Sequence, residues 1–252
     1  MHRKTLPAFR TIAFVSGLLM LGSAQAHQVW IEQDAQGAKL YFGEFSENLR
    51  EASPGLLDKF VKPLAHRLSA QGAQALDATK TANGFALSAR AGKGESLVAE
   101  EPAYPISERK DGDKAIRTLY APAARLATDY GRQEPKLTLD LVPTGQHGKD
   151  GVQVQAFYKG QPLPKARIGV VTAAGWGQEQ RADEQGRLVV QLPWKGSYVL
   201  EVKHADGAGE RASAQGPEKY DRASYVTSLT LMQPEGLPSL PAAPAAAPNK
   251  MN

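Results

Sequence analysis

Short runs in which apolar and polar residues alternate recur along most of the chain. Alternation through 28–32, a glycine turn and a second apolar run at 39–42 predict an N-terminal hairpin. Comparable runs follow at 137–143, 152–158, 166–171, 188–192, 196–202 and 223–232. Many short strands of this kind predict a mostly β fold of immunoglobulin-like β-sandwich type.

One segment departs from the alternating pattern. Ser53-Pro54 precedes an apolar group at positions 56, 57, 60 and 61. Serine suits the N-cap of a helix and proline suits its first turn, so the pattern predicts one short helix that ends before Pro63.

The spacing of polar and glycine-rich stretches predicts two domains. Residues 145–151 are polar and rich in glycine, which places a boundary between a β domain at 27–144 and a β-sandwich at 145–232. Proline and alanine dominate residues 233–252. Such a tail buries little apolar surface, so we expect it to be disordered.

The first 26 residues have the pattern of a cleaved signal peptide. Arg3 and Lys4 form a basic start, residues 12–21 are apolar, and Ala24-x-Ala26 matches the small-residue cleavage pattern. The apolar run is too short to span a bilayer. The sequence therefore predicts an exported protein, periplasmic in a Gram-negative cell, whose mature chain begins at His27.

Charge and composition narrow the class of function. Beyond residue 26 the chain carries 27 basic and 26 acidic residues, so its charge gives no support for nucleic-acid or membrane-surface binding. There is no cysteine, which excludes disulfides and thiolate metal sites. The sequence contains no serine-nucleophile elbow, no phosphate-binding glycine loop and no His-Glu-x-x-His motif, so we expect no enzyme activity.

His27 is the strongest candidate for chemistry. As the first residue of a processed chain, it would offer its α-amino group and its imidazole to one divalent transition metal ion. The mature chain has three other histidines, and none forms a close-spaced pair with another. His204 follows a predicted strand, His66 alternates with apolar neighbours, and Glu44 lies one strand from His27. These residues are the candidate partners of His27 for nickel, cobalt or copper, although solvated or hydrogen-bonded side chains are the commoner explanation for each of them.

The second half of the chain resembles the transthyretin-like and carboxypeptidase-regulatory-like modules of immunoglobulin type. A strand at 152–158, the Gly160-x-Pro162-Leu163 turn, an Asp183–Gly186 turn and the Gly196-x-Tyr198 strand follow the order of these modules. The resemblance covers about 60 residues and implies a β-sandwich.

Most of the mature chain also resembles a bacterial periplasmic family associated with cobalt and nickel uptake. The likeness lies in Ala26-His27-Gln28-Val29-Trp30-Ile31, in the run 41–45, and in the blocks 186–204 and 225–231. Relatives often begin with alanine, histidine, an acid, leucine and tryptophan, and they carry a glycine-histidine pair after the second strand. Here Gln28-Val29 replaces the acid-leucine pair and Glu44 replaces the second histidine. The resemblance implies a metal-binding protein that hands its ion to a membrane transporter or an outer-membrane receptor.

Two other functions fit the sequence. A periplasmic interaction or structural module would present its loops to a protein partner and bind no metal. A carbohydrate-binding protein would stack a sugar on an exposed indole, for which Trp176 between two glycines is the candidate.

Overall fold

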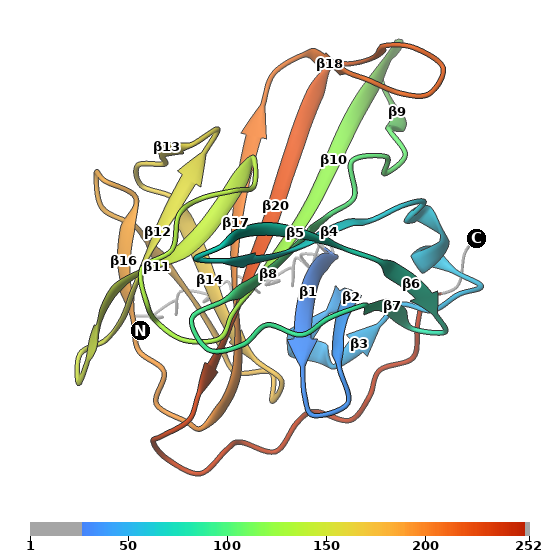
Figure 1. Ribbon diagram of the computed structural model, residues 1–252. Helices are drawn as coiled ribbons and strands as arrows, with labels where there is room; N and C mark the ends of the chain where they lie inside the picture. The colour runs from blue at the N-terminus through green and yellow to red at the C-terminus, as the bar shows by residue number, and fades with distance from the viewer. Residues whose placement is uncertain (1–26, 250–252) are drawn as a thin grey trace, which may run out of the picture.

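The computed structural model describes residues 27–249 and is built almost entirely of β-strands (Figure 1). The predicted mostly β class is confirmed. The helices within these residues are two short 3-10 helices, η1 (Phe45–Glu47) and η2 (Leu56–Lys59). The predicted signal peptide, 1–26, lies outside the described residues. Between residues 27 and 249, no helix has the length and apolar character needed to cross a membrane.

The strands form three larger sheets and one small pair. The five-stranded sheet contains β1 (Gln28–Gln33), β2 (Ala38–Glu44), β3 (Leu49–Arg50), β6 (Ala78–Thr81) and β7 (Gly84–Leu87). The nine-stranded sheet contains β4 (Leu64–Ser69), β5 (Gly72–Leu76), β8 (Ser96–Glu100), β9 (Ser107–Asp111), β10 (Lys114–Ala127), β14 (Arg167–Thr172), β15 (Gly177–Arg181), β17 (Gly196–Asp206) and β20 (Arg222–Gln233). The four-stranded sheet contains β11 (Leu139–Gly148), β12 (Gly151–Tyr158), β13 (Gln161–Pro162) and β16 (Arg187–Val190), and the pair is β18 (Gly209–Arg211) with β19 (Glu218–Tyr220).

The nine-stranded sheet is a central layer with a different partner on each face. Side chains alternate between the faces of a strand, so Ala124 and Leu126 of β10 point to one side and Leu229 and Leu231 of β20 point to the other. The first pair packs in a core with β1, β2 and β7. The second pair packs in a core with β11 and β12. We call these sides the first face and the second face; Figure 1 shows the two covering sheets on opposite sides of β10 and β20.

Strands from both predicted domains share the central sheet. β20 comes from the second half of the chain and pairs in parallel with β10, from Thr118–Arg222 to Leu126–Thr230. β20 also pairs antiparallel with β17 along its length. Each half therefore has its own core, and one continuous sheet joins them.

The glycine-rich stretch at 145–151 begins inside a strand. The ladder between β11 and β12 shifts register between Pro143 and His147, and Gly145 has φ of 88° there. A β-bulge accommodates glycine and polar residues within a strand. In the sequence alone, the same residues are typical of a linker. The predicted boundary at residue 145 consequently falls within β11.

The predicted helix is replaced by the short η2. Gly55 follows Pro54 with φ of 155°, and a side chain at this position would meet the Ala52 carbonyl oxygen at 2.7 Å. This positive φ, which favours glycine, interrupts the helical conformation between Pro54 and Leu56, so the helix begins only at Leu56.

The C-terminal segment also differs from the expectation. The sequence predicts no order after residue 233, whereas the structure lays residues 234–249 along the body of the protein. The Leu237 backbone bonds to the backbone of Pro193 and Lys195, and the Ala243 N–H donates to Ala173. These hydrogen bonds compensate for the small apolar surface that the segment buries.

A buried ion pair fixes the connection between the two halves. Arg125 of β10 and Asp140 of β11 are both fully buried, and Nη2 lies 2.6 Å from Oδ2. Asp140 also accepts the N–H groups of Lys136 and Leu137, while the guanidinium donates to Gln133. The pair thus holds the loop between β10 and β11 from both ends.

Removal of one partner of this pair should destabilise the protein strongly. Arg125→Ala leaves the Asp140 carboxylate buried without its counter-charge, which costs roughly 3–5 kcal/mol of unfolding free energy. Urea denaturation measures the change. Arg132→Ala is the matched control, because the Arg132–Glu134 pair is exposed on both sides and should change stability by less than about 0.5 kcal/mol. Equal effects of the two substitutions would contradict this role of the buried pair.

Candidate metal site at His27

His27 lies immediately before β1 at the edge of the first core. Its backbone carbonyl accepts a hydrogen bond of 2.6 Å from the Tyr120 hydroxyl on β10. Its ring centroid lies 5.0 Å from that of Phe42 on β2, and its side chain is 16% exposed. These contacts hold the imidazole in one place while leaving part of it accessible.

Glu51 holds one nitrogen of this imidazole. Nε2 of His27 lies 2.5 Å from Oε1 of Glu51, whose side chain is fully buried. The Glu51 carboxylate also accepts two hydrogen bonds from Asn249, one from the backbone N–H to Oε2 and one from the side-chain amide to Oε1. Because a carboxylate oxygen accepts and Oε1 already accepts the Asn249 amide, Nε2 donates to Oε1 and carries the ring proton. In the neutral ring, Nδ1 then carries the free lone pair.

Glu44 faces this other nitrogen. Its Oε1 lies 3.9 Å from Nδ1 of His27, and the side chain is 12% exposed. Within residues 27–249, this buried oxygen has no hydrogen-bond partner. Gly43 makes the arrangement possible, because a side chain there would meet the Leu49 carbonyl oxygen at 2.3 Å and push β3 away.

The surroundings of His27 are acidic. Burial, and next the charge of Glu47, raise the pKa of Glu44, while His27 acts in the opposite direction. Burial is also the main cause that raises the pKa of Glu201 on β17; Lys203, 2.7 Å away, opposes this rise, and Glu44 adds a smaller contribution to it. The pKa of Tyr104 rises to about 12, mainly through burial and then through the charge of Glu51. A cation near His27 would relieve the repulsion among these carboxylates.

The structure does not bring His204 to His27, which corrects the predicted leading pair. On β17, His204 shares a face with Leu200 and Val202, which belong to the core of the second face. Its ring centroid lies 4.1 Å from that of Tyr158 on β12. His27 lies beside Phe42, whose core covers the first face, so the central sheet separates the two histidines.

His66 is separated from His27 for the same reason. Its neighbour Ala65 points into the core of the first face, so His66 on β4 points to the second face. It lies opposite Val98, which packs with Ala123 and Leu137 in a small separate cluster. Of the predicted partners, only Glu44 lies beside His27.

The sequence pattern did not identify three residues that lie around His27: Glu51, Tyr120 and Asn249. Glu51 follows the two-residue strand β3, and its N–H donates to the Phe42 carbonyl. Asn249 belongs to the segment that was expected to be disordered. Glu51 and Asn249 belong to no local sequence motif, because long-range pairing brings each of them to His27. Across residues 27–249, no three His, Asp or Glu side chains are grouped as a ready metal site.

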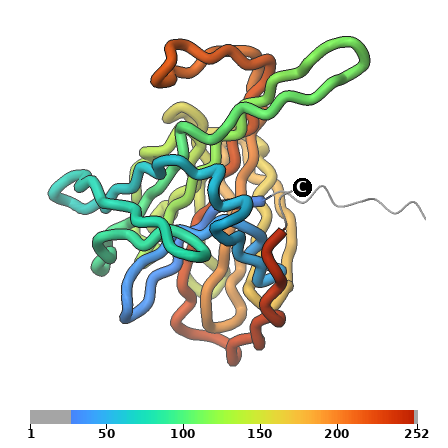
Figure 2. The backbone as a smooth tube through the Cα atoms, turned by 90° about the vertical axis from the view of Figure 1, so that its right-hand side faces the viewer, coloured from blue at the N-terminus to red at the C-terminus, as the bar shows by residue number. Residues whose placement is uncertain are grey.

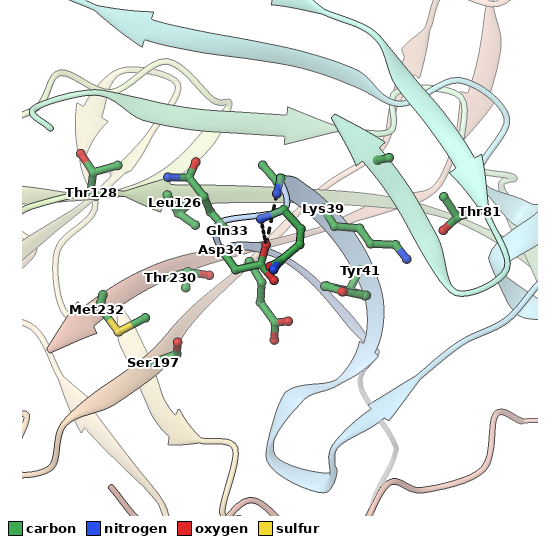
Figure 3. Close-up of a pocket in the computed structure, with 16 residues that line it drawn as sticks. Gln33, Asp34, Lys39, Tyr41, Thr81, Leu126, Thr128, Ser197, Thr230 and Met232 are labelled. Carbon is green, nitrogen blue, oxygen red and sulfur yellow. Dashed lines mark hydrogen bonds between the residues drawn. The ribbon is translucent and has the colours of Figure 1, made fainter. Parts of the chain in front are cut away.

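A pocket of about 640 Å³ lies elsewhere, between the β1–β2 hairpin and strands β10, β17 and β20 (Figure 3). Several of its polar groups already hold the protein together. Asp34 accepts the N–H groups of Gln36 and Gly37, and Gln33 exchanges two hydrogen bonds with Ala91. The Thr230 hydroxyl is buried without a partner within residues 27–249, but one hydroxyl defines no class of ligand.

The tryptophans pack against other aromatic rings. Trp30 is fully buried between Tyr41 and Phe45. Trp176 and Trp194 lie edge to face at 5.1 Å and pack on the core of the second face. Trp176 is half-buried by this packing, which reduces the indole surface available to a sugar ring.

The fold and the site together define a mostly β protein with two cores on one central sheet and a His-carboxylate cluster at the start of its first strand. Comparison with protein-family models and with curated protein sequences finds no match.

Loss of the Glu51 carboxylate should destabilise the protein. Glu51→Ala leaves His27 Nε2 and the two Asn249 donors without their acceptor, at a cost of about 1–3 kcal/mol of unfolding free energy. Glu47→Ala is the matched control, because Glu47 is exposed and should change stability by less than about 0.5 kcal/mol. Urea denaturation of both variants tests this, and a Glu51→Ala protein as stable as the control would contradict it.

Proposed function

We propose that the processed protein binds a divalent transition metal ion, nickel, cobalt or copper, through His27 and Glu44. The donors are the α-amino group of His27, its Nδ1 and Oε1 of Glu44. The observation that carries the proposal is the unpartnered, buried Oε1 of Glu44, which faces Nδ1. The ion is cargo in this proposal, and the protein supports its uptake.

The tautomer of His27 supports this role. A histidine that binds a metal usually donates its other ring N–H to a carboxylate, which orients the ring and makes the ligating nitrogen more basic. Glu51 occupies this position on Nε2. The remaining nitrogen, Nδ1, is the one that can close a six-membered chelate ring with the α-amino group of the same residue.

The distance between the proposed donors is compatible with one ion. Metal bonds to nitrogen and to carboxylate oxygen are each roughly 2.0–2.2 Å long, so an ion can contact two atoms up to about 4.2 Å apart. Nδ1 and Oε1 are 3.9 Å apart. Since the third donor is a backbone amine, the site needs only two side chains.

The donor set suits the three metals named above and also zinc. Amine and imidazole nitrogens suit nickel, cobalt, copper and zinc, and the affinity of such sites generally increases from cobalt to copper. The surrounding carboxylates favour a divalent cation over a monovalent one. The role in uptake, in the periplasm, rests on the export signal and on the family resemblance.

Binding should require a free amino group on His27. Calorimetric titration of a chain that begins at His27 with nickel, cobalt, copper and zinc should give micromolar or tighter binding for at least one ion. One extra residue before His27 should abolish it, because the amide nitrogen that replaces the amine is a poor ligand. No binding to either chain would refute the proposal and favour an interaction module, while equal binding to both would exclude the amine.

Substitutions should separate Glu44 and Glu51 from the other candidates. Glu44→Gln should weaken binding at least about tenfold by removing a charged ligand, and Glu51→Gln should weaken it about 10–100-fold by replacing the carboxylate that accepts Nε2–H with a neutral amide. His204→Ala and His66→Ala are the controls and should leave affinity unchanged. The same titrations measure all four, and loss of binding with His204→Ala alone would refute the site.

A further inference from the structure

The C-terminal segment 234–249 reaches the His27 site from the opposite end of the chain. We call it the strap. Figure 2 shows it leaving the end of β20 and running beside the N-terminal strands. The strap bonds to residues that lie next to β17 and β14 in the sequence, and it also contacts the N-terminal sheet. There, Asn48 donates to the Ala243 carbonyl at 2.8 Å, and Ala246 forms a parallel bridge with Leu49.

Asn249 ends this path at Glu51. Its backbone N–H lies 3.1 Å from Oε2, and its side-chain amide lies 2.7 Å from Oε1. The same amide nitrogen is 3.2 Å from Nε2 of His27. Nε2 of His27 and the Asn249 amide nitrogen both donate to Oε1 of Glu51. These two bonds fix the plane of the Glu51 carboxylate relative to the imidazole ring.

The strap is held by hydrogen bonds and not by apolar packing. Every residue from Pro234 to Asn249 is exposed or half-buried, so no apolar side chain anchors it in a core. It contains five prolines, which restrict the chain to extended conformations and lower the entropy lost when it docks. Segments with few buried contacts open with a small free energy while the core stays folded.

We infer that Asn249 is a positioning residue for the His27–Glu51 pair, and that the strap controls exchange at the site by docking and detaching. With the strap docked, Asn249 orients Glu51, and Glu51 keeps the proton on Nε2 of His27. With the strap detached, Glu51 loses two of its three donors, and the imidazole is free to turn and to exchange its tautomers. The exchange of metal rests on the proposed function, whereas the positioning of the imidazole does not.

The first test measures the imidazole without any metal. Long-range proton–nitrogen NMR of the histidine-labelled chain reports which ring nitrogen carries the proton. In the unsubstituted chain, His27 should show one protonated nitrogen, Nε2, and one unprotonated nitrogen, Nδ1. Asn249→Ala should bring the two nitrogen shifts of His27 toward each other, because the tautomers then interconvert. His66 and His204 are internal controls, and Asn83→Ala, at an exposed asparagine between β6 and β7, is the matched substitution.

The second test measures release of nickel by stopped-flow with an excess of chelator. Asn249→Ala, and a chain that ends at Gln233, should both release nickel at least about tenfold faster than the unsubstituted chain and Asn83→Ala. Unchanged release rates in a chain that binds nickel would overturn control by the strap. If the unsubstituted chain binds no metal, the proposed function fails, while the NMR still decides the positioning role. Identical His27 spectra for the unsubstituted chain and Asn249→Ala would overturn that role.

Discussion

The parallel pairing of β20 with β10 is the constraint on which the rest of the structure depends. β20 is the last strand within residues 27–249, and two consecutive residues on it reach opposite layers. The Thr227 hydroxyl donates to the Leu139 carbonyl on the second face, and the Ser228 hydroxyl donates to the Val29 carbonyl on the first face. Both residues are buried. A register slip of one residue would exchange the two faces and bury both hydroxyls without partners, so the pairing specifies the position of both covering sheets.

The position of His27 follows from this pairing. Ser228 holds β1 at Val29, two residues beyond His27, and Tyr120 on the neighbouring β10 holds the carbonyl of His27 itself. The ring is then enclosed by residues from later parts of the chain, Glu44 at the end of β2, Glu51 just after β3 and Asn249 in the strap. The site therefore forms only when the first and last strands of the protein have met.

Alternation of apolar and polar residues predicted strands with one buried face, such as β12 and β14, but not exposed strands such as β9 and β18. Partners of each strand are set by register over long separations, which no local pattern encodes. Pro122 illustrates this limit: it suggests a break, yet β10 continues through it because its neighbour changes there from β9, which pairs to Thr118, to β8, which pairs from Ala123. His66 and His204 were misplaced relative to His27 for the same reason. Glu44 was placed correctly because it lies on the hairpin partner of His27, so its distance follows from local pairing alone.

A structural role for His27 would account for its bond to Glu51 but not for the state of Glu44. An anchoring histidine needs one buried partner, and Glu51 with Asn249 provides a complete hydrogen-bonded set. Glu44 instead places a carboxylate oxygen, without a hydrogen-bond partner among residues 27–249, beside the unprotonated nitrogen of the ring. Two acceptors that face each other in a partly buried site repel, and neither can relieve the other without a proton or a cation between them. The cost of this arrangement is difficult to explain by packing, since a glutamine could donate to Nδ1 from the same position. A positively charged ligand removes the cost directly, and this is the physical reason to look for a metal ion at His27.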